Sequence, residues 1–188
     1  MKIENLEILK RGGVGVLATD TIYGLVGQAE NCQTVERLYD LKERKDDKPF
    51  IILIANVADL EIFGVEYTLE EKGILLKYWP GALSVVASKL DPKFSYLKRG
   101  GRFPSFRLPN KKDLIEVLKQ TGPLVAPSAN LIDQEPARNI EMAKQYFGNR
   151  VDFYEDSGEV AGEPSTVIEF IAGKIKVWRE GAVRIEIR

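Results

Sequence analysis

Residues 14–24 read VGVLATDTIYG, an apolar run that passes directly into a polar stretch rich in hydroxyl groups. The run 14–18 is typical of a strand that is buried on both faces, and residues 19–24 are typical of the loop after such a strand. Residues 3–11 predict a short helix that ends at a glycine pair. Residues 32–44 carry apolar side chains at helical spacing and predict a second helix.

The rest of the chain continues this alternation and then ends in strands. We expect strands at 50–54, 83–88, 102–108, 124–126, 151–155, 166–171, 174–179 and 183–187. We expect helices from a capping box at Thr68 and Glu71 to about Trp79, from Asn110 as N-cap to Gln120, and at 140–147. This order predicts an α/β fold with a single domain over residues 1–188, in which helices flank a twisted mixed β-sheet.

The composition excludes several classes of site. The chain has 188 residues, a net charge of −1, one cysteine and no histidine. Without histidine there can be no Ser-His-Asp triad, no Cys–His pair and no histidine metal site, and we expect no resident metal. We expect Cys32 to be a buried apolar residue. The single cysteine and the lack of a long apolar run predict a cytoplasmic protein without a membrane segment.

Polar residues follow several predicted strands, at the ends where open α/β sheets bind ligands. These polar segments are 19–24, 42–50, 126–130 and 163–166, with Arg179 at the end of a later strand. These segments also have purely structural interpretations. Residues 19–24 could form a turn that places Tyr23 in the core, the cations of 42–50 could complement a helix dipole, and 126–130 could be an ordinary turn. A strand arginine that points inward, such as Arg107 or Arg102, would need an anion partner.

No glycine-rich phosphate loop accompanies these segments. The chain contains neither G-x-x-x-x-G-K-[ST] nor G-x-G-x-x-G. A nucleotide would therefore be held by scattered lysine, arginine, serine and asparagine side chains. The residues alone indicate a site for a small anion or a nucleotide, and they leave the ligand open.

Seven short motifs, in order along the chain, resemble those of one known family. They are TDTIYGL at 19–25, KER and KPF within 42–50, WPGALS at 79–84, SFRLP at 105–109, PLVAPSAN at 123–130, PSTVI at 164–168 and REGA at 179–182. Together they resemble the YrdC family of threonylcarbamoyl-AMP synthases, in its short bacterial form. The resemblance covers nearly the whole chain and implies a fold with a large concave surface.

The resemblance also implies a reaction. L-threonine, bicarbonate and ATP would give threonylcarbamoyl-AMP and pyrophosphate, for the threonylcarbamoyladenosine modification of tRNA. ATP would be a substrate that carries Mg²⁺ with it. Partner proteins would transfer the threonylcarbamoyl group to the tRNA.

The family's site residues carry over by motif. The resemblance implies that Lys42 and Arg44 are catalytic and contact the phosphates. ATP would also be bound by Lys48, Ser128, Asn130 and Arg179. L-threonine would be bound by Thr21, Tyr23, Arg107 and Ser165, with Arg107 pairing with its carboxylate. The resemblance assigns no role to Asp20, whose purely structural interpretation is that it holds the loop through backbone hydrogen bonds. The chain departs from the family pattern at Ala18, at Leu53 and at 132–133, where a proline, a histidine of some relatives and an S-G pair are replaced.

Two other functions fit parts of the sequence. The chain could be an RNA-binding YrdC-like module without adenylate synthesis, or could bind RNA weakly beside its activity, through a basic patch of Lys45, Arg99, Arg102, Lys111 and Lys112. A carbamoyl-transfer module like that of hydrogenase maturation proteins is disfavoured, because those modules normally sit in longer chains that are rich in cysteine.

Overall fold

The computed structural model describes residues 1–43 and 48–186. The first half contains α1 (Ile3–Lys10), β1 (Gly15–Ala18), β2 (Tyr23–Gln28), α2 (Cys32–Leu41), β3 (Ile51–Leu53), η1 (Val57–Phe63), α3 (Leu69–Tyr78) and β4 (Leu83–Val86). The second half contains η2 (Pro92–Leu97), β5 (Ser105–Arg107), α4 (Lys112–Thr121), β6 (Leu124–Val125), α5 (Ile140–Phe147), β7 (Phe153–Tyr154), β8 (Thr166–Ile171) and β9 (Lys174–Arg179). The elements η1 and η2 are 3₁₀ helices.

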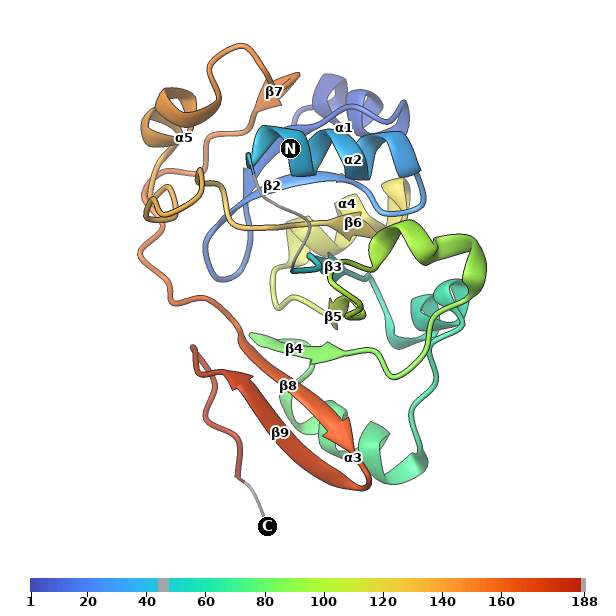
Figure 1. Ribbon diagram of the computed structural model, residues 1–188. Helices are drawn as coiled ribbons and strands as arrows, with labels where there is room; N and C mark the ends of the chain where they lie inside the picture. The colour runs from blue at the N-terminus through green and yellow to red at the C-terminus, as the bar shows by residue number, and fades with distance from the viewer. Residues whose placement is uncertain (44–47, 187–188) are drawn as a thin grey trace.

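The strands form one mixed sheet in the order β7-β1-β2-β6-β3-β5-β4-β8-β9. The pairs β1–β7, β3–β5 and β4–β8 are parallel and the others are antiparallel. The β8–β9 hairpin forms one edge of the sheet, with α3 beside it (Figure 1). The predicted α/β class with a mixed sheet and flanking helices is confirmed.

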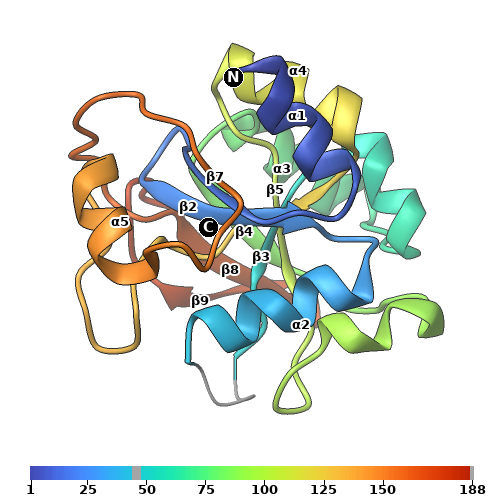
Figure 2. The ribbon, with the colours of Figure 1, turned by 90° about the horizontal axis from the view of Figure 1, so that it is seen from above.

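The two faces of the sheet are covered by different helices. The larger core packs α2, α5, η1 and η2 against side chains such as Ile52, Val85 and Phe106. On the opposite face α1 and α4 cover a smaller core that includes Leu17 and Leu53. Figure 2 shows α1 and α4 on one side of the strands and α2 on the other. The smaller core covers only the half of that face that lies under α1 and α4. The candidate site lies on the other half of the same face.

Helix starts follow the local sequence closely. The capping box that opens α3 is present, because Glu71 N donates to Thr68 Oγ1 at 3.2 Å and Thr68 N donates to Glu71 Oε2 at 2.7 Å. Asn110 is not the N-cap of α4, which starts after Lys111 with no side-chain cap. The Asn110 backbone N–H instead donates to Asp20 Oδ2 at 2.9 Å. The prediction of this cap was wrong because a distant carboxylate fixes the Asn110 backbone.

Three other predictions need correction. The loop predicted over 19–24 ends early, because Tyr23 begins the unpredicted strand β2. A Cβ on Gly27 of this strand would lie 2.4 Å from Thr34 Cγ2, so glycine is needed where α2 approaches the strand. No strand forms over residues 183–186, although Val183 N donates to Thr166 Oγ1 at 3.2 Å. Cys32 is exposed at the first position of α2 rather than buried.

Candidate active site

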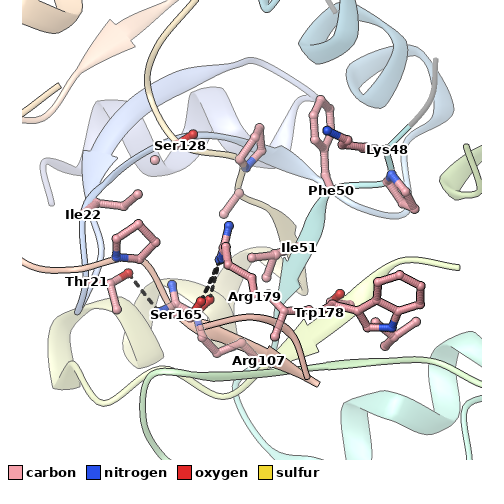
Figure 3. A pocket seen from close by; sticks show the side chains of 18 of the residues that line it. Thr21, Ile22, Lys48, Phe50, Ile51, Arg107, Ser128, Ser165, Trp178 and Arg179 are labelled. Atoms are coloured by element: carbon pink, nitrogen blue, oxygen red, sulfur yellow. Dashed lines mark hydrogen bonds between the residues drawn. The ribbon is translucent and has the colours of Figure 1, made fainter. Parts of the chain in front are cut away.

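A pocket of about 790 Å³ lies on the sheet face that carries Ile51, Arg107 and Val167. Residues of β2, β3, β4, β5, β8 and β9, and of the loops after β1 and β6, line it. Figure 3 shows Thr21 and Ser165 at one end of this pocket, Arg179 in the middle and Trp178 at the other end. Segments far apart in the sequence therefore meet in one hollow, as the large concave surface of the resemblance implied.

Most of the predicted site residues line this pocket. They are Thr21, Tyr23, Lys48, Arg107, Ser128, Ser165 and Arg179. Lys42 and Asn130 do not line it and lie behind the loop of Ser128. Arg44, which was predicted to contact the phosphates, lies outside the described residues, as does Lys45. The roles assigned to all ten residues of the predicted site stay predictions, while the convergence of the seven is observed.

Arg107 forms the charged end of the pocket. Its side chain is buried, with 3% of the residue exposed. Nη1 donates to Thr21 Oγ1 at 2.9 Å and lies 3.0 Å from Asp20 Oδ1, in an ion pair. Burial lowers the pKa of Arg107, and Asp20 opposes that shift. The expectation that an inward arginine needs an anion is met by Asp20, which also accepts the backbone N–H of Asn110 as expected of a loop-holding residue.

The Arg107–Asp20 pair leaves hydrogen-bonding capacity unused. Arg107 Nε is buried and donates no hydrogen bond within the described part of the chain. Asp20 Oδ1 is also buried and accepts no well-aligned hydrogen bond there. A buried guanidinium gains strongly from a second anionic partner. The charged end is therefore suited to a carboxylate.

Arg179 lies in the middle of the pocket and is fixed by β8. Its Nε and Nη2 donate to Ser165 O at 3.0 and 2.8 Å, and Nη2 also donates to Ser165 Oγ at 3.2 Å. The Ser165 hydroxyl lies 2.8 Å from Ser84 Oγ. Burial lowers the pKa of Arg179, yet no carboxylate pairs with it among residues 1–43 and 48–186. A fixed, partly buried guanidinium without a carboxylate is suited to bind an anion such as a phosphate.

Lys42 supports the loop of Ser128 from behind the pocket. Its ammonium donates to Ser128 O at 2.7 Å and to Asn130 Oδ1 at 2.8 Å, and Ser128 Oγ donates to the same Asn130 oxygen at 2.6 Å. Lys42 is only 4% exposed. In this arrangement Lys42 supports the pocket wall that carries Ser128, and any direct contact with a bound ligand would need Lys42 to exchange these partners.

Tyr23 both lines the pocket and holds a neighbouring loop. Its hydroxyl donates to Gly158 O at 2.8 Å and accepts the Ser157 backbone N–H at 2.9 Å. Burial raises the pKa of Tyr23. Gly162 in the same loop approaches Thr21 O so closely that a Cβ would lie 2.0 Å away. The loop 156–165 therefore closes the end of the pocket that carries Thr21.

Several pocket residues were missed by the sequence analysis. They are Val86, Phe103, Val167, Glu169 and Trp178, and Trp178 lies at the end opposite Thr21 (Figure 3). The one sequence signal that could have found Trp178 is its position directly before Arg179 at a strand end. Val86, Val167 and Glu169 alternate with core residues in strands, so only the three-dimensional arrangement of the sheet shows which face each occupies, and Phe103 lies before β5.

The comparison with known families places the chain. The family model described as "Telomere recombination" (Sua5_yciO_yrdC) matches residues 7–181. The chain belongs to the Sua5/YciO/YrdC family. This match covers the segments that build the pocket, from the Thr21 loop to Arg179, and it confirms the family named from the motifs.

Members of the Sua5/YciO/YrdC family with similar sequences carry one enzyme name. The chain is 29% identical to the threonylcarbamoyl-AMP synthase of Pseudoalteromonas translucida over 89% of this chain and 91% of that protein. It is 29% identical to the threonylcarbamoyl-AMP synthase of Bacillus subtilis over 86% of this chain, but this match covers 47% of the longer protein.

Solved structures of the Sua5/YciO/YrdC family agree with the fold. Sua5 of P. abyssi, in a crystal structure with L-threonine, has a TM-score of 0.85 and 26% identity, over 95% of this chain and 53% of that one. YciO of E. coli has a TM-score of 0.81 over 95% of this chain and 87% of that one, at 22% identity, which shows the fold alone.

Two residues of the basic patch of the RNA-binding alternative are engaged within the protein. Arg99 pairs with Glu36 at 2.6 Å, and Lys111 donates to Ala18 O at 2.8 Å. Arg102 lies at the pocket rim. Across the described ranges no helix is both long and apolar enough to cross a bilayer. The enzyme name of the relatives favours the enzyme interpretation over a binding module.

Proposed function

We propose that this protein makes L-threonylcarbamoyl-AMP from L-threonine, bicarbonate and ATP and releases pyrophosphate. The observation that carries the proposal is that a buried arginine with unused hydrogen-bonding capacity and a second, fixed arginine share one pocket of about 790 Å³. Such a pocket has room for an amino acid beside a nucleotide. The enzyme name shared by the relatives supports the same reaction.

L-threonine would bind at the charged end. Its carboxylate would pair with the guanidinium of Arg107, which lines the pocket. Thr21 and Ser165 supply hydroxyl groups at this end of the pocket, and Tyr23 fixes the loop that closes it. Because the charge of Arg107 is already balanced by Asp20, the site would hold the zwitterion without a net excess of positive charge.

ATP would bind across the middle of the pocket. Arg179 and Ser128 would contact the nucleotide, and Lys48 would contact the outer phosphates. Lys42 and Asn130 would fix the Ser128 loop, and Arg44 would complete the phosphate contacts. Magnesium would arrive with ATP and neutralise part of the triphosphate charge. Across the described residues no cluster of three metal-binding side chains exists, so the phosphates would supply most of its ligands.

The protein's contribution to the chemistry would be positioning and charge neutralisation. The threonine amine combines with bicarbonate to give a carbamate and water. A carbamate oxygen then forms a bond to the α-phosphorus as the bond to pyrophosphate breaks. Arg179 lies between the ends of the pocket and would stabilise the negative charge at the α-phosphate. None of these steps needs a histidine or a covalent enzyme intermediate.

In the cell the product would serve tRNA modification in the cytoplasm. Threonylcarbamoyl-AMP is a mixed anhydride that water hydrolyses, so we expect a transfer protein to accept it soon after release. Weak RNA binding near the pocket would be compatible with this role.

The test is pyrophosphate release measured with all three substrates and with each omitted. We expect release that requires both L-threonine and bicarbonate. Arg179→Met should lower the rate by roughly a hundredfold, the scale for loss of one charge-stabilising group, while Lys119→Ala, an exposed change on α4, should leave it unchanged. Release that is indifferent to L-threonine would refute the proposal.

A further inference from the structure

The end of the pocket farthest from Arg107 has no role in the site described above. Trp178 lines it together with Glu169, to which it is hydrogen-bonded, and Val86, Phe103 and Val167 also line the pocket. Trp178 is 47% exposed, which is unusual for the largest apolar side chain of a small protein. Figure 3 shows its ring at the opposite end of the pocket from Thr21, with Arg179 between them.

An irregularity in β9 puts Trp178 there. Val167 pairs with Arg179, and Ile168 pairs with Val177, so Trp178 is an extra residue with no partner on β8. In a β-bulge of this kind consecutive side chains can point to the same face of the sheet, whereas in a regular strand they alternate. Trp178 and Arg179 accordingly both line the pocket.

The indole ring is held in place by its neighbours. Trp178 Nε1 donates to Glu169 Oε2 at 2.7 Å, and Lys176 Nζ lies 3.6 Å from the ring centroid. Lys176 occupies space over the ring, so a planar ligand would stack on whatever area it leaves open. Arg102 reaches the ring only at 5.7 Å, near the limit of a cation–π contact, and its exposed side chain can move aside.

We propose that Trp178 is the stacking platform for the purine base of the nucleotide substrate. This inference rests on the proposed function and names the part of the pocket that holds the base. The end at Thr21 and Arg107 is matched to an amino-acid carboxylate and the middle to phosphates, which leaves the aromatic end at Trp178 for the base. Base–aromatic stacking is a strong contact that any purine can make.

Glu169 would act on the same base indirectly. Its carboxylate fixes the edge of the indole and so sets the plane on which the base stacks. Val86 and Val167 lie on neighbouring strands β4 and β8 and would contact the rest of the base from the floor of the pocket.

The experiment compares the dissociation constants of AMP and of inorganic tripolyphosphate, which lacks a base. We expect Trp178→Ala to weaken AMP binding about tenfold and tripolyphosphate binding less than twofold. Trp178→Phe, which keeps an aromatic ring, should stay within about threefold of the wild type. Ile171→Ala is the matched control, because Ile171 is 45% exposed on the same hairpin but does not line the pocket. Thermal unfolding of each variant checks that the fold is intact.

Three outcomes would overturn the proposal. If Trp178→Ala and Ile171→Ala bind AMP with equal affinity, Trp178 does not contact the nucleotide. In that case the proposed function can still hold, provided that ATP-dependent activity is observed. Equal loss of AMP and tripolyphosphate binding would show that Trp178 acts on the nearby cations and not on a base. A wild type that binds neither AMP nor ATP would refute both this inference and the proposed function.

Discussion

The buried ion pair between Arg107 and Asp20 allows a test of stability and of substrate binding in the same variants. Their side chains are 4% and 7% exposed, and Nη1 lies 3.0 Å from Oδ1. Removing one partner of a buried pair leaves an uncompensated charge and typically costs about 3–5 kcal/mol. The pair borders an open pocket, so water can approach it, and we take the lower end, about 3 kcal/mol.

The assay is a double-mutant cycle of Arg107→Met, Asp20→Asn and the two together, followed by urea unfolding. We expect each single variant to lose about 3 kcal/mol of unfolding free energy, which is roughly 6–12 °C in Tm for a chain of this size. The double variant should lose less than the sum of the singles by about 2 kcal/mol or more. Simple additivity of the two losses would refute a direct coupling.

The same variants separate structure from substrate binding. Arg107→Met should raise the L-threonine KM at least a hundredfold, since it removes the proposed carboxylate partner, with little change in the KM for ATP. In Asp20→Asn the arginine remains, so the L-threonine KM should change much less at temperatures where the variant is folded. If both variants raise the KM equally, Asp20 would be a direct part of the amino-acid site and the assigned roles would be wrong.

Three further predictions concern other parts of the molecule. Gly27→Ala should cost about 1–3 kcal/mol in urea unfolding, because its Cβ would lie 2.4 Å from Thr34 Cγ2; Thr34→Ala in the same background should restore part of the loss. Tyr23→Phe removes the bonds to the loop near Gly158 and should speed amide exchange at that loop, with exchange in β5 unchanged. Burial raises the pKa of Tyr96 to about 12, so the stability that this group contributes is complete below pH 10 and is lost as pH rises toward 12. A Tyr96→Phe variant should lack this part of the alkaline decline in unfolding free energy, and identical pH profiles for the two proteins would contradict the shift.

The helices and the buried strands could be predicted from the sequence because their signals are local. Residues 140–147, 166–171 and 174–179 match α5, β8 and β9 in their bounds. The strand β2 was missed because its two glycines lower strand propensity, and its Gly27 is selected by the close approach of α2. The expected N-cap at Asn110 failed for a related reason, since a carboxylate ninety positions away captures its N–H.

The chemistry at the two ends of the pocket was not equally accessible to sequence analysis. The charged end is built from residues whose types alone suggest a role, namely Arg107, Thr21 and Ser165. The aromatic end depends on which face of the sheet a residue occupies. For Trp178 that face is decided by one extra residue in β9, and a bulge has no reliable sequence signal.

The alternation of side chains in β5 and its neighbouring strands explains why a charged pocket can lie on one face of a sheet whose other face carries the main core. Ser105 and Arg107 face the pocket, while Phe106 between them is fully buried in the larger core. In β3 the alternation is the same, with Ile51 in the pocket and Ile52 in the core, and the parallel register pairs Ile52 with Phe106. A helix packed over this face, as α1 and α4 pack over the first half of it, would bury Arg107 without room for a ligand. The open half of the face is therefore what allows the protein to bury a guanidinium and still keep it at the wall of a pocket with room for a substrate.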